Sequence, residues 1–451
     1  MKYGLTYFLH DLAVSTGLLK TLREAFPNDW KRIFALAAFL VHDGKEELKL
    51  EDFMERYLTY PMEKSSSQKS PEPLPRLNRE ECQKFFREWS VRVNEKQFAA
   101  FDSDSVPLYV KNNSPSEYRE TRSAKGSLSK PMRVLWGRNS KTPVCFASSR
   151  GNLNNVSSIG AALKEFKTAA NSSDIWVVNS FGVNVKNTLE KYGAIPETKF
   201  ISNVPPTDQN SVKIIDVIIN GNYFQSPSTV IRANHDGVRG MTWNERWYSR
   251  NLHAHVYLDR MKDSETKMML DNAVNELTEL FVNDKLSAKD RKMFIETFLT
   301  KTEDSPKLVC LNNWLVLITN QVTINVQEAY DSHIAKIQTG HALENYFEKL
   351  DALSPSKEKD ERFGDKSTVA FAALVLDSRV NRVMTESGLC RVLSRRKVLR
   401  QMAKLRAVWG ADDAFHPNKP LTETQKIILT AFDIEPPNRR IINRFIKKIL
   451  D

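Results

Sequence analysis

Two aspartates two positions apart mark the first place where this sequence could support chemistry. The segment FAAFDSDSVPLYV, residues 98–110, is mostly apolar and predicts a strand. Asp102 and Asp104 would project from one face of it, because side chains alternate along a strand. Carboxylate oxygens are preferred ligands of Mg²⁺, so the pair is a candidate metal site. The competing interpretation is a polar strand end, where aspartate is common.

A second candidate is the His-x-His pattern of His253 and His255, on another expected strand. Two histidines on one strand face could ligate a metal, although neither a cysteine nor a third ligand is evident nearby. Ordinary packing is the alternative. The sequence contains neither a GxSxG elbow nor a GxxxxGK[ST] loop, so these signatures of hydrolases and nucleotide-binding proteins give no support.

Basic residues gather in three stretches of the chain, which carries 66 Lys+Arg against 55 Asp+Glu and a formal net charge of +11. This excess suits a polyanion, and we expect contacts with the phosphates of double-stranded DNA. Solvated helix surfaces are the alternative for each stretch. The candidate residues are Arg119, Arg122, Lys125 and Lys130 in a polar loop, then Arg391, Arg395, Arg396, Lys397, Arg400, Lys404 and Arg406, and finally Arg439, Arg440, Arg444, Lys447 and Lys448. Trp243 and Trp247, with arginines beside them, could stack on bases or pack in the core.

The elements that would position these residues follow from periodicity and punctuation. We expect a helical N-terminal region (1–62), a proline-rich linker (63–77), a first core part (78–204), a β-rich and helical insertion (205–320), and last core helices with a basic helical C-terminus (321–451). Between residues 98 and 204 the expected order is strand, strand, strand, helix, strand, helix, strand. This order predicts a mixed α/β layer architecture.

Three finer predictions go with this scheme. Asn78 and Glu81 predict a capping box, and Asn139-Ser140 predicts a turn between two strands. The β-rich insertion is expected to include VKIIDVIING (212–221) and to continue into charged helices at about 263–284 and 287–300. The basic stretch 391–406 is expected to be a helix whose buried stripe includes Leu393, Leu399, Met402 and Trp409.

Composition excludes several classes of protein. The four cysteines are far apart and form no CxxC pair, which favours a reducing compartment and argues against a cysteine zinc site. No apolar run reaches the roughly 18 residues that span a bilayer. The N-terminal stretch carries His10 and Asp11 within its apolar residues, so we expect an amphipathic helix rather than a signal peptide. A cytoplasmic, nucleoid-associated protein is the expectation, with a homodimer as an open possibility.

Three segments, in chain order, resemble the DDE-type insertion-sequence transposases. FAAFDSDSVPLY resembles the strand with the first catalytic Asp, which maps onto Asp102. Gly151-Asn152 followed by DIWVVNSF resembles the second segment, where Asn179 stands at the position of the second Asp. EAYDSHIAKIQTGHALENYFEKLDAL is similar to the late helix. Tyr330 and Glu344 match its Tyr and Glu, whereas His333 and Asp351 stand at its Arg and Lys positions.

The resemblance implies an RNase H-like mixed-sheet core with a β-rich insertion and helical N- and C-terminal regions. It implies catalytic positions at Asp102, Asn179 and Glu344, and DNA contacts at Tyr330 and His333. Two Mg²⁺ or Mn²⁺ ions about 4 Å apart would hold the attacking and leaving oxygens of a phosphoryl transfer. An asparagine offers one neutral oxygen, and Asp351 would oppose a phosphate, so the resemblance also implies a weakened metal site.

Three functions remain open on this basis. The leading one is a DNA-binding protein derived from a cut-and-paste transposase and impaired in catalysis. The second is an active transposase or nuclease that uses Asp102, Asp104 and Glu344 with Mg²⁺. The third is a protein-interaction module that kept the fold and lost both DNA and metal. The family assignment requires Asp102, Asn179 and Glu344 to converge in space.

Overall fold

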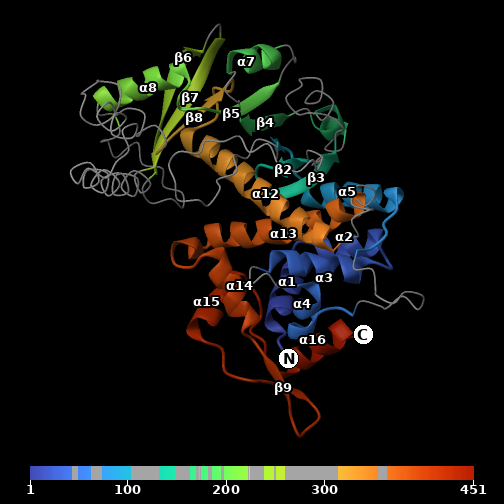
Figure 1. The fold of residues 1–451 in the computed structure, drawn as a ribbon. Coiled ribbons are helices and arrows are strands. Elements are labelled where there is room, and N and C mark those ends of the chain that lie inside the picture. Colours follow the sequence, from blue (N-terminus) through green and yellow to red (C-terminus); the bar gives the residue numbers. More distant parts are fainter. Residues whose placement is uncertain are drawn as a thin grey trace, which may run out of the picture. The chain divides into compact units, whose positions relative to one another are not determined.

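The chain adopts a mixed α/β fold in a computed structural model (Figure 1). The structure describes residues 1–42, 49–61, 74–102, 132–148, 163–168, 172, 174–180, 185–193, 198–221, 223, 238–247, 250–259, 313–353 and 363–450. By internal contacts it divides into unit 1, Met1–Ile175 with Ile337–Asp451, and unit 2, Trp176–Lys336. Unit 1 is therefore built from both ends of the chain. The sequence predicted different boundaries, at residues 204 and 320.

The strands form a mixed sheet in the order β3-β2-β1-β4-β5-β8-β7-β6, with β9 and β10 as a separate pair. Their bounds are β1 Phe98–Asp102, β2 Met132–Gly137, β3 Thr142–Ser148, β4 Ile175–Ser180, β5 Lys199–Val204, β6 Val238–Trp247, β7 Arg250–Asp259, β8 Trp314–Thr319, β9 Ala407–Trp409 and β10 Phe415–Pro417. The first three strands form an antiparallel meander, whereas β4 and β5 are parallel. The mixed α/β architecture that the expected order of strands and helices predicted is confirmed.

Helices supply most of unit 1. Those before the sheet are α1 Gly4–Ser15, α2 Leu18–Ala25, α3 Trp30–Val41, α4 Leu50–Arg56 and α5 Arg79–Val93. Those after it are α12 Val326–Ala352, α13 Phe363–Glu386, α14 Arg395–Ala403, α15 Glu423–Ala431 and α16 Arg439–Leu450, with a 3₁₀ turn, η6, at Leu389–Arg391. The predicted capping box at the start of α5 is confirmed, because Asn78 and Glu81 exchange both side-chain to backbone hydrogen bonds.

Helix α13 forms the centre of unit 1. Its stretch Val369–Leu376 is apolar on every side of the helix, and each of its residues is at most 3% exposed. A helix that is apolar all round needs neighbours all round, and Figure 1 shows α13 between the strands β2 and β3 and the helices α1 and α3. The Phe371 ring contacts Phe86 and Phe146, each at 5.0 Å between centroids. This packing joins the helical layer to the meander.

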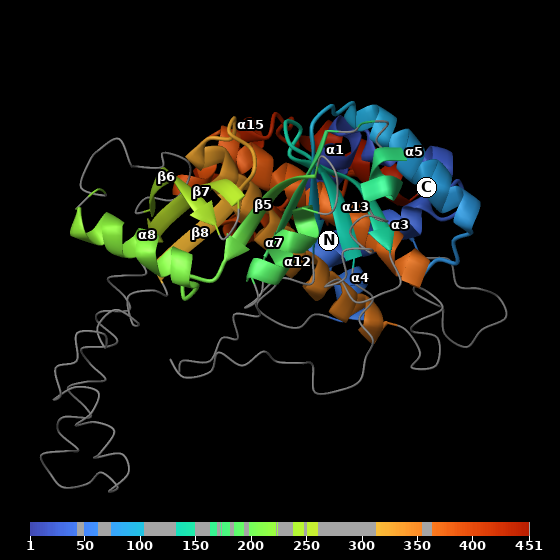
Figure 2. The same cartoon turned by 90° about the horizontal axis from the view of Figure 1, so that it is seen from above.

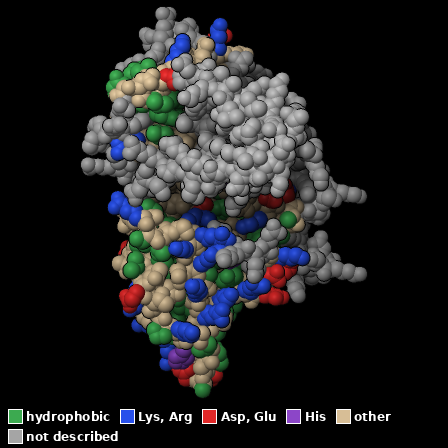
Figure 3. Space-filling view, turned by 60° about the vertical axis from the view of Figure 1, so that its left-hand side comes forward, with side chains coloured by type: hydrophobic (Ala, Val, Ile, Leu, Met, Phe, Trp, Pro, Cys, Tyr) green, Lys and Arg blue, Asp and Glu red, His purple; other side chains and the backbone are tan. Residues whose placement is uncertain are grey.

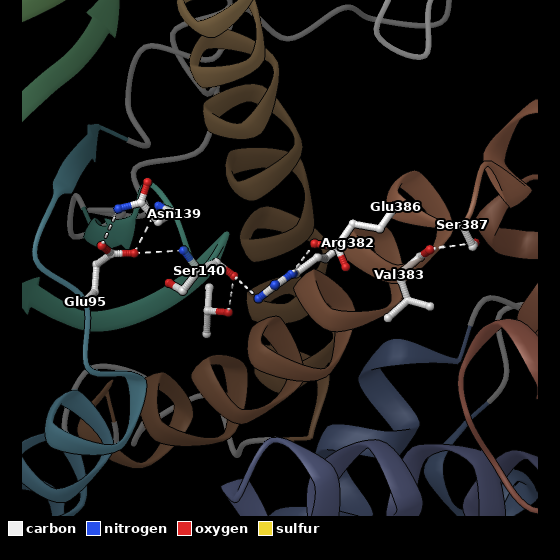
Figure 4. Close-up of polar contacts among 8 residues, drawn as sticks. Glu95, Asn139, Ser140, Arg382, Val383, Glu386 and Ser387 are labelled. Carbon is white, nitrogen blue, oxygen red and sulfur yellow. Dashed lines mark hydrogen bonds and ion pairs between the residues drawn. The ribbon is translucent and has the colours of Figure 1, made fainter.

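A carboxylate fixes the turn of the meander beside α13 (Figure 4). Glu95 accepts hydrogen bonds from the backbone N–H groups of Asn139 (3.0 Å) and Ser140 (2.8 Å). Burial raises the pKa of Glu95, but the backbone N–H donors of Gln97, Ser140 and Lys96 outweigh it, so the net pKa is lowered. Arg382 of α13 donates to the Ser140 carbonyl oxygen (2.8 Å). The predicted turn at Asn139-Ser140 is confirmed, and α13 holds it.

Among its described residues, unit 2 carries α7 Val185–Gly193, α8 Gln209–Asn220 and the first turns of α12, up to Lys336. Figures 1 and 2 both show α8 alongside the strands β6 and β7. The prediction of β structure at 212–221 was wrong, because most of this segment belongs to α8. Its valines and isoleucines suggested a strand, but Ser211, Ile214, Ile215 and Ile218 have helical spacing and are buried together. The charged helices expected at 263–284 and 287–300 lie outside the described residues.

The expected helix over 391–406 is also shorter than predicted. Helix α14 covers only Arg395–Ala403, and the chain then turns into the β9–β10 hairpin. Trp409 lies on β9 and is 60% exposed, so its assignment to a buried stripe was wrong. The stripe itself is confirmed for Leu399 and Met402, which are buried. Among the described helices, none is long and apolar enough to cross a membrane.

Asp377 of α13 ties α12 and α14 together. It accepts a hydrogen bond from the Tyr346 hydroxyl of α12 (3.1 Å) and forms an ion pair with Arg395 of α14. Arg395 also donates to the Val41 carbonyl oxygen at the end of α3 (3.3 Å). Removing one partner of a buried pair leaves the other uncompensated, which typically costs about 3 kcal/mol.

We therefore expect Asp377→Ala to lower the free energy of unfolding in urea by about 3 kcal/mol. Glu386→Ala, which removes the exposed Arg382–Glu386 pair on the same helix, should cost less than about 1 kcal/mol. Equal losses for the two variants would contradict a structural role for Asp377.

Candidate nucleic-acid interface and the expected metal site

The first two expected catalytic positions lie in the sheet. Asp102 is the last residue of β1, paired with Arg133 of β2, and belongs to unit 1. Asn179 lies in β4, paired with Ser202 of β5, and belongs to unit 2. Asp104 lies outside the described residues.

The Asn179 amide is bound within the sheet. It is 6% exposed, and its Oδ1 atom accepts a hydrogen bond from the fully buried Ser202 hydroxyl. That oxygen is the one atom through which an asparagine side chain could ligate a hard cation. The position is thus satisfied by a neutral partner, and the pair fits a structural role.

The register of unit 2 also fixes the direction of this amide. Asn179 shares its sheet face with Ala254 of β7, through Ser202 and Ile318. Tyr257, three residues after Ala254, projects from the opposite face because side chains alternate. There the Tyr257 hydroxyl donates to the Val326 carbonyl oxygen (2.7 Å) and its ring contacts Tyr330 (5.1 Å). The first turns of α12 therefore cover the face away from Asn179.

The third catalytic position, Glu344, is an exposed residue in the second half of α12 and belongs to unit 1. Seven residues on, Asp351 forms an ion pair (2.7 Å) with Lys366 of α13, which is only 1% exposed. The sequence predicted that a phosphate would be opposed by Asp351, whose partner in the structure is this lysine. Its negative charge balances a buried lysine inside unit 1.

The two α12 residues expected to contact DNA are buried in unit 2. Tyr330 packs on Tyr257, and burial, with smaller effects of Asp259 and Asp331, raises its pKa to about 12. Burial and then neighbouring Lys336 lower the pKa of His333 to about 3. Both side chains are part of the interior of unit 2 as the chain is folded here.

The His-x-His pattern of β7 does place both rings on one face, as predicted. His255 is fully buried, and its Nδ1 atom lies 3.0 Å from the Thr242 hydroxyl. Burial, and then His253, lower the pKa of His255 to about 4. No group of three or more His, Cys, Asp or Glu suited to a metal occurs among the described residues.

A scan against protein-family models finds no match to the chain, and a search of curated proteins finds none either.

A basic surface on unit 1 is the best-defined candidate interface. We use this name for six residues from three parts of the chain: Lys2, Arg56, Lys397, Arg400, Lys404 and Arg406. Figure 3 shows Lys and Arg side chains gathered on the side of unit 1 that carries α14 and α15, with few acidic ones among them. Two structural features bring these residues together.

The first feature is the N-terminal segment. The backbone of Lys2 pairs with Tyr57 on one side and with Arg406 on the other. Burial, and then Arg406 and Arg56, lower the pKa of Lys2, which shows that like charges are held close together. The Lys2 ammonium also lies 5.1 Å from the centre of the Tyr57 ring.

The second feature is the amphipathic helix α14. Lys397, Arg400 and Lys404 are three and four positions apart, so they form one stripe. The opposite side, Val398, Leu399, Met402 and Ala403, is buried. The backbone N–H groups of Tyr3 and Gly4 donate to the Leu405 carbonyl oxygen (3.3 and 3.4 Å), which joins the stripe to Lys2. Within the described part of the chain, no salt bridge involves Lys2, Lys397, Arg400, Lys404 or Arg406.

The other basic residues singled out from the sequence have different places. Arg391 is exposed at the end of η6, Arg396 is half-buried, and Arg395 is committed to Asp377. Arg119, Arg122, Lys125 and Lys130 lie outside the described residues. Lys2 and Arg56 were missed by sequence reasoning, because only the backbone bridges at Lys2 bring them to Arg406.

The buried histidines of unit 2 make its stability depend on pH. Their folded-state pKa values lie below the unfolded value of about 6.5, so the folded state binds fewer protons. Their contribution is fully present above about pH 6.5 and is lost as the pH falls toward their folded pKa values. Replacing His333 by Leu should remove up to about 1.4 kcal/mol of destabilisation per pH unit below 6.5.

Urea unfolding at pH 7, 5.5 and 4.5 measures this difference, with exposed His341→Gln as the matched control. Parallel pH profiles for wild type and His333→Leu would contradict the burial of a neutral imidazole at this position.

Proposed function

We propose that this chain is a DNA-binding protein with an RNase H-like core, derived from a cut-and-paste DDE transposase and impaired in catalysis. The observation that carries the proposal is the basic surface, where like charges from distant segments are assembled. At five of its six residues, no salt bridge to an acidic group occurs among the described residues. Double-stranded DNA is the polyanion whose backbone spacing such an extended surface suits.

The electrostatics favour a phosphate partner. Burial lowers the pKa of Lys2, and Arg406 and Arg56 lower it further, so gathering these cations costs free energy in the free protein. A phosphate placed among Lys2, Lys404 and Arg406 would relieve this repulsion and release condensed counterions from the DNA. The α14 stripe extends the same surface by two helical turns. Its side chains would contact the phosphate backbone of the DNA without reading the base sequence.

The fold supports the family part of the proposal. An antiparallel meander followed along the chain by two parallel strands, in the order β3-β2-β1-β4-β5, is the arrangement expected of an RNase H-like core. The backbone N–H of Phe98, at the start of β1, donates to the carbonyl oxygen of Asp174, immediately before β4 (3.3 Å). The strands β6, β7 and β8 lie between β5 and α12 along the chain, where a β-rich insertion is expected.

The impairment is supported by three residues. Asn179 offers a neutral oxygen that already accepts from Ser202, so the residues present do not fit a two-metal site. His333 stands buried at the expected arginine position, and Asp351 pairs with Lys366 at the expected lysine position. Mg²⁺ or Mn²⁺ would be a cofactor only of an active form.

DNA binding should depend on salt through the basic surface. The triple variant Lys397→Gln, Lys404→Gln, Arg406→Gln removes three phosphate contacts. We expect the slope of log K against log salt to fall in magnitude by about 2.7, at about 0.9 per contact. Fluorescence anisotropy of a labelled duplex between 50 and 300 mM salt, as a rough working range, measures this slope.

The matched control is Lys84→Gln, Lys164→Gln, Lys426→Gln, which makes the same charge change at exposed positions of unit 1. Equal losses for the two triples would reduce the proposal to a net-charge effect. No measurable duplex binding by the wild type would instead favour the protein-interaction module.

The metal site can be tested by restoring a carboxylate. We expect wild-type protein to show neither Mg²⁺-dependent nicking of DNA nor a change in melting temperature with Mn²⁺. Asn179→Asp buries a carboxylate, so it should lower stability in chelator and recover part of the loss when Mn²⁺ is added. Asn179→Ser, which adds no charge, is the control.

Two outcomes would change the assignment. Metal-dependent cleavage by the wild type would establish the active enzyme that uses Asp102, Asp104 and Glu344. An Asn179→Asp variant that is indifferent to Mn²⁺ would remove Asn179 from the expected catalytic set.

A further inference from the structure

A second cationic cluster on unit 1 surrounds two buried polar atoms that have no hydrogen-bond partner among the described residues. It lies where α1, α2 and α16 meet and consists of His10, Tyr60, Arg23, Arg444 and Lys448, which we call the His10 cluster. None of these residues belongs to the basic surface, and the inference drawn from them does not depend on DNA binding.

The floor of the cluster is aromatic and polar. His10 is 6% exposed and Tyr60 is 1% exposed, with 6.4 Å between their ring centroids. Phe445 of α16 and Phe34 of α3 pack against the His10 ring at 5.4 and 6.0 Å. Within the described part of the chain, the His10 Nε2 and Tyr60 hydroxyl atoms are buried without a hydrogen-bond partner. Such orphaned groups cost about 1–3 kcal/mol each.

The rim of the cluster is basic. Burial lowers the pKa of His10, and Lys448 and Arg23 lower it further. Burial also lowers the pKa of Lys448, and Arg23 and Arg444 add to this effect, so the three cations lie close together. The Arg23 guanidinium is 4.2 Å from the centre of the Trp30 ring. Burial raises the pKa of Tyr60, and the nearby Arg23 guanidinium partly offsets this rise, although no hydrogen bond of standard geometry joins the two side chains.

The acidic groups around the cluster are too few to balance it. The Asp11 carboxylate of α1 partly offsets the lowering of the Lys448 pKa. The pKa of Asp11 is itself raised by burial and by Asp433. Across the described residues, no salt bridge involves Arg23, Arg444 or Lys448. Within that part of the chain, these cations lack a salt-bridge partner and the two buried polar atoms lack a hydrogen-bond partner, so an anion would complete the arrangement on both counts.

We propose that the His10 cluster binds a phosphate group. A phosphate carries close to two negative charges and several acceptor oxygens, which matches an arginine fork, two further cations, a phenol and an imidazole N–H. A carboxylate has only two oxygens and would leave donors unsatisfied. The phosphate could belong to a free phosphate ester or to a nucleic acid, and the two sources are separated below.

Titration of the full-length protein with inorganic phosphate tests the site. Isothermal calorimetry at constant ionic strength should show saturable binding, and the imidazole resonances of His10 should shift in NMR spectra. Arg23→Gln, Lys448→Gln should weaken binding at least tenfold. The control Lys20→Gln, Lys447→Gln makes the same charge change at exposed lysines of the same two helices and should change affinity less than twofold.

A conservative variant guards against misfolding. Arg23→Lys, Lys448→Arg keeps both charges and should retain binding within about threefold, with circular dichroism confirming the fold. Absence of saturable phosphate binding, or equal losses in the two glutamine pairs, would overturn the proposal.

The source of the phosphate follows from competition. Displacement of inorganic phosphate by glucose 6-phosphate, with duplex binding unaffected by Arg23→Gln, Lys448→Gln, assigns a free ester. Displacement by a duplex, lost in the same variant, assigns a nucleic acid. The triple variant of the basic surface should leave phosphate affinity unchanged, so the two sites can fail separately.

Discussion

The burial of α13 is the constraint on which unit 1 depends. An apolar helix surrounded on all sides cannot be stable until the meander and the N-terminal helices pack against it. Its polar residues then act as ties: Asp377 holds α12 and α14, Lys366 holds Asp351, and Arg382 holds the turn at Ser140. The direction of α14, and with it the basic stripe, follows from these contacts.

Two cationic regions lie on unit 1. At one, Lys2 is held between Tyr57 and Arg406, so that three segments present their charges together. At the other, α16 buries Phe445 against His10 and brings Lys448 close to Arg23. In both, the apolar side of an amphipathic helix sets where its charged side is displayed.

Local patterns predicted most of the elements but few of the contacts between them. The capping box of Asn78 and Glu81, the turn at Asn139-Ser140 and the order of strands and helices from Phe98 to Val204 depend on neighbours in sequence, and they were predictable. Helix α8 was missed because β-branched composition outweighed the helical spacing of Ile214 and Ile218. The exposure of Trp409 was missed because the β9–β10 hairpin interrupts the helical pattern.

In the candidate sites, contacts between distant elements were even less predictable from the sequence. Basic residues of α14 could be recognised from composition, yet the commitment of Arg395 to Asp377 depends on a helix 18 positions away in sequence. No sequence pattern marked Lys2 or Arg56 as a candidate DNA contact. The Asn179–Ser202 pair depends on the register of β4 and β5, which no local pattern specifies. The three expected catalytic positions remain a prediction from resemblance.

Unit 1 is built from two separate stretches of the chain, and this affects how it folds during translation. Helix α5, the last of the early helices, ends at Val93, whereas α13 begins at Phe363, so 269 residues lie between the two halves of one core. At a ribosomal rate of about 5–20 residues per second, the early helices wait roughly 15–50 s for the helix that buries their apolar faces. During each round of translation that nascent surface is open to chaperones and to aggregation.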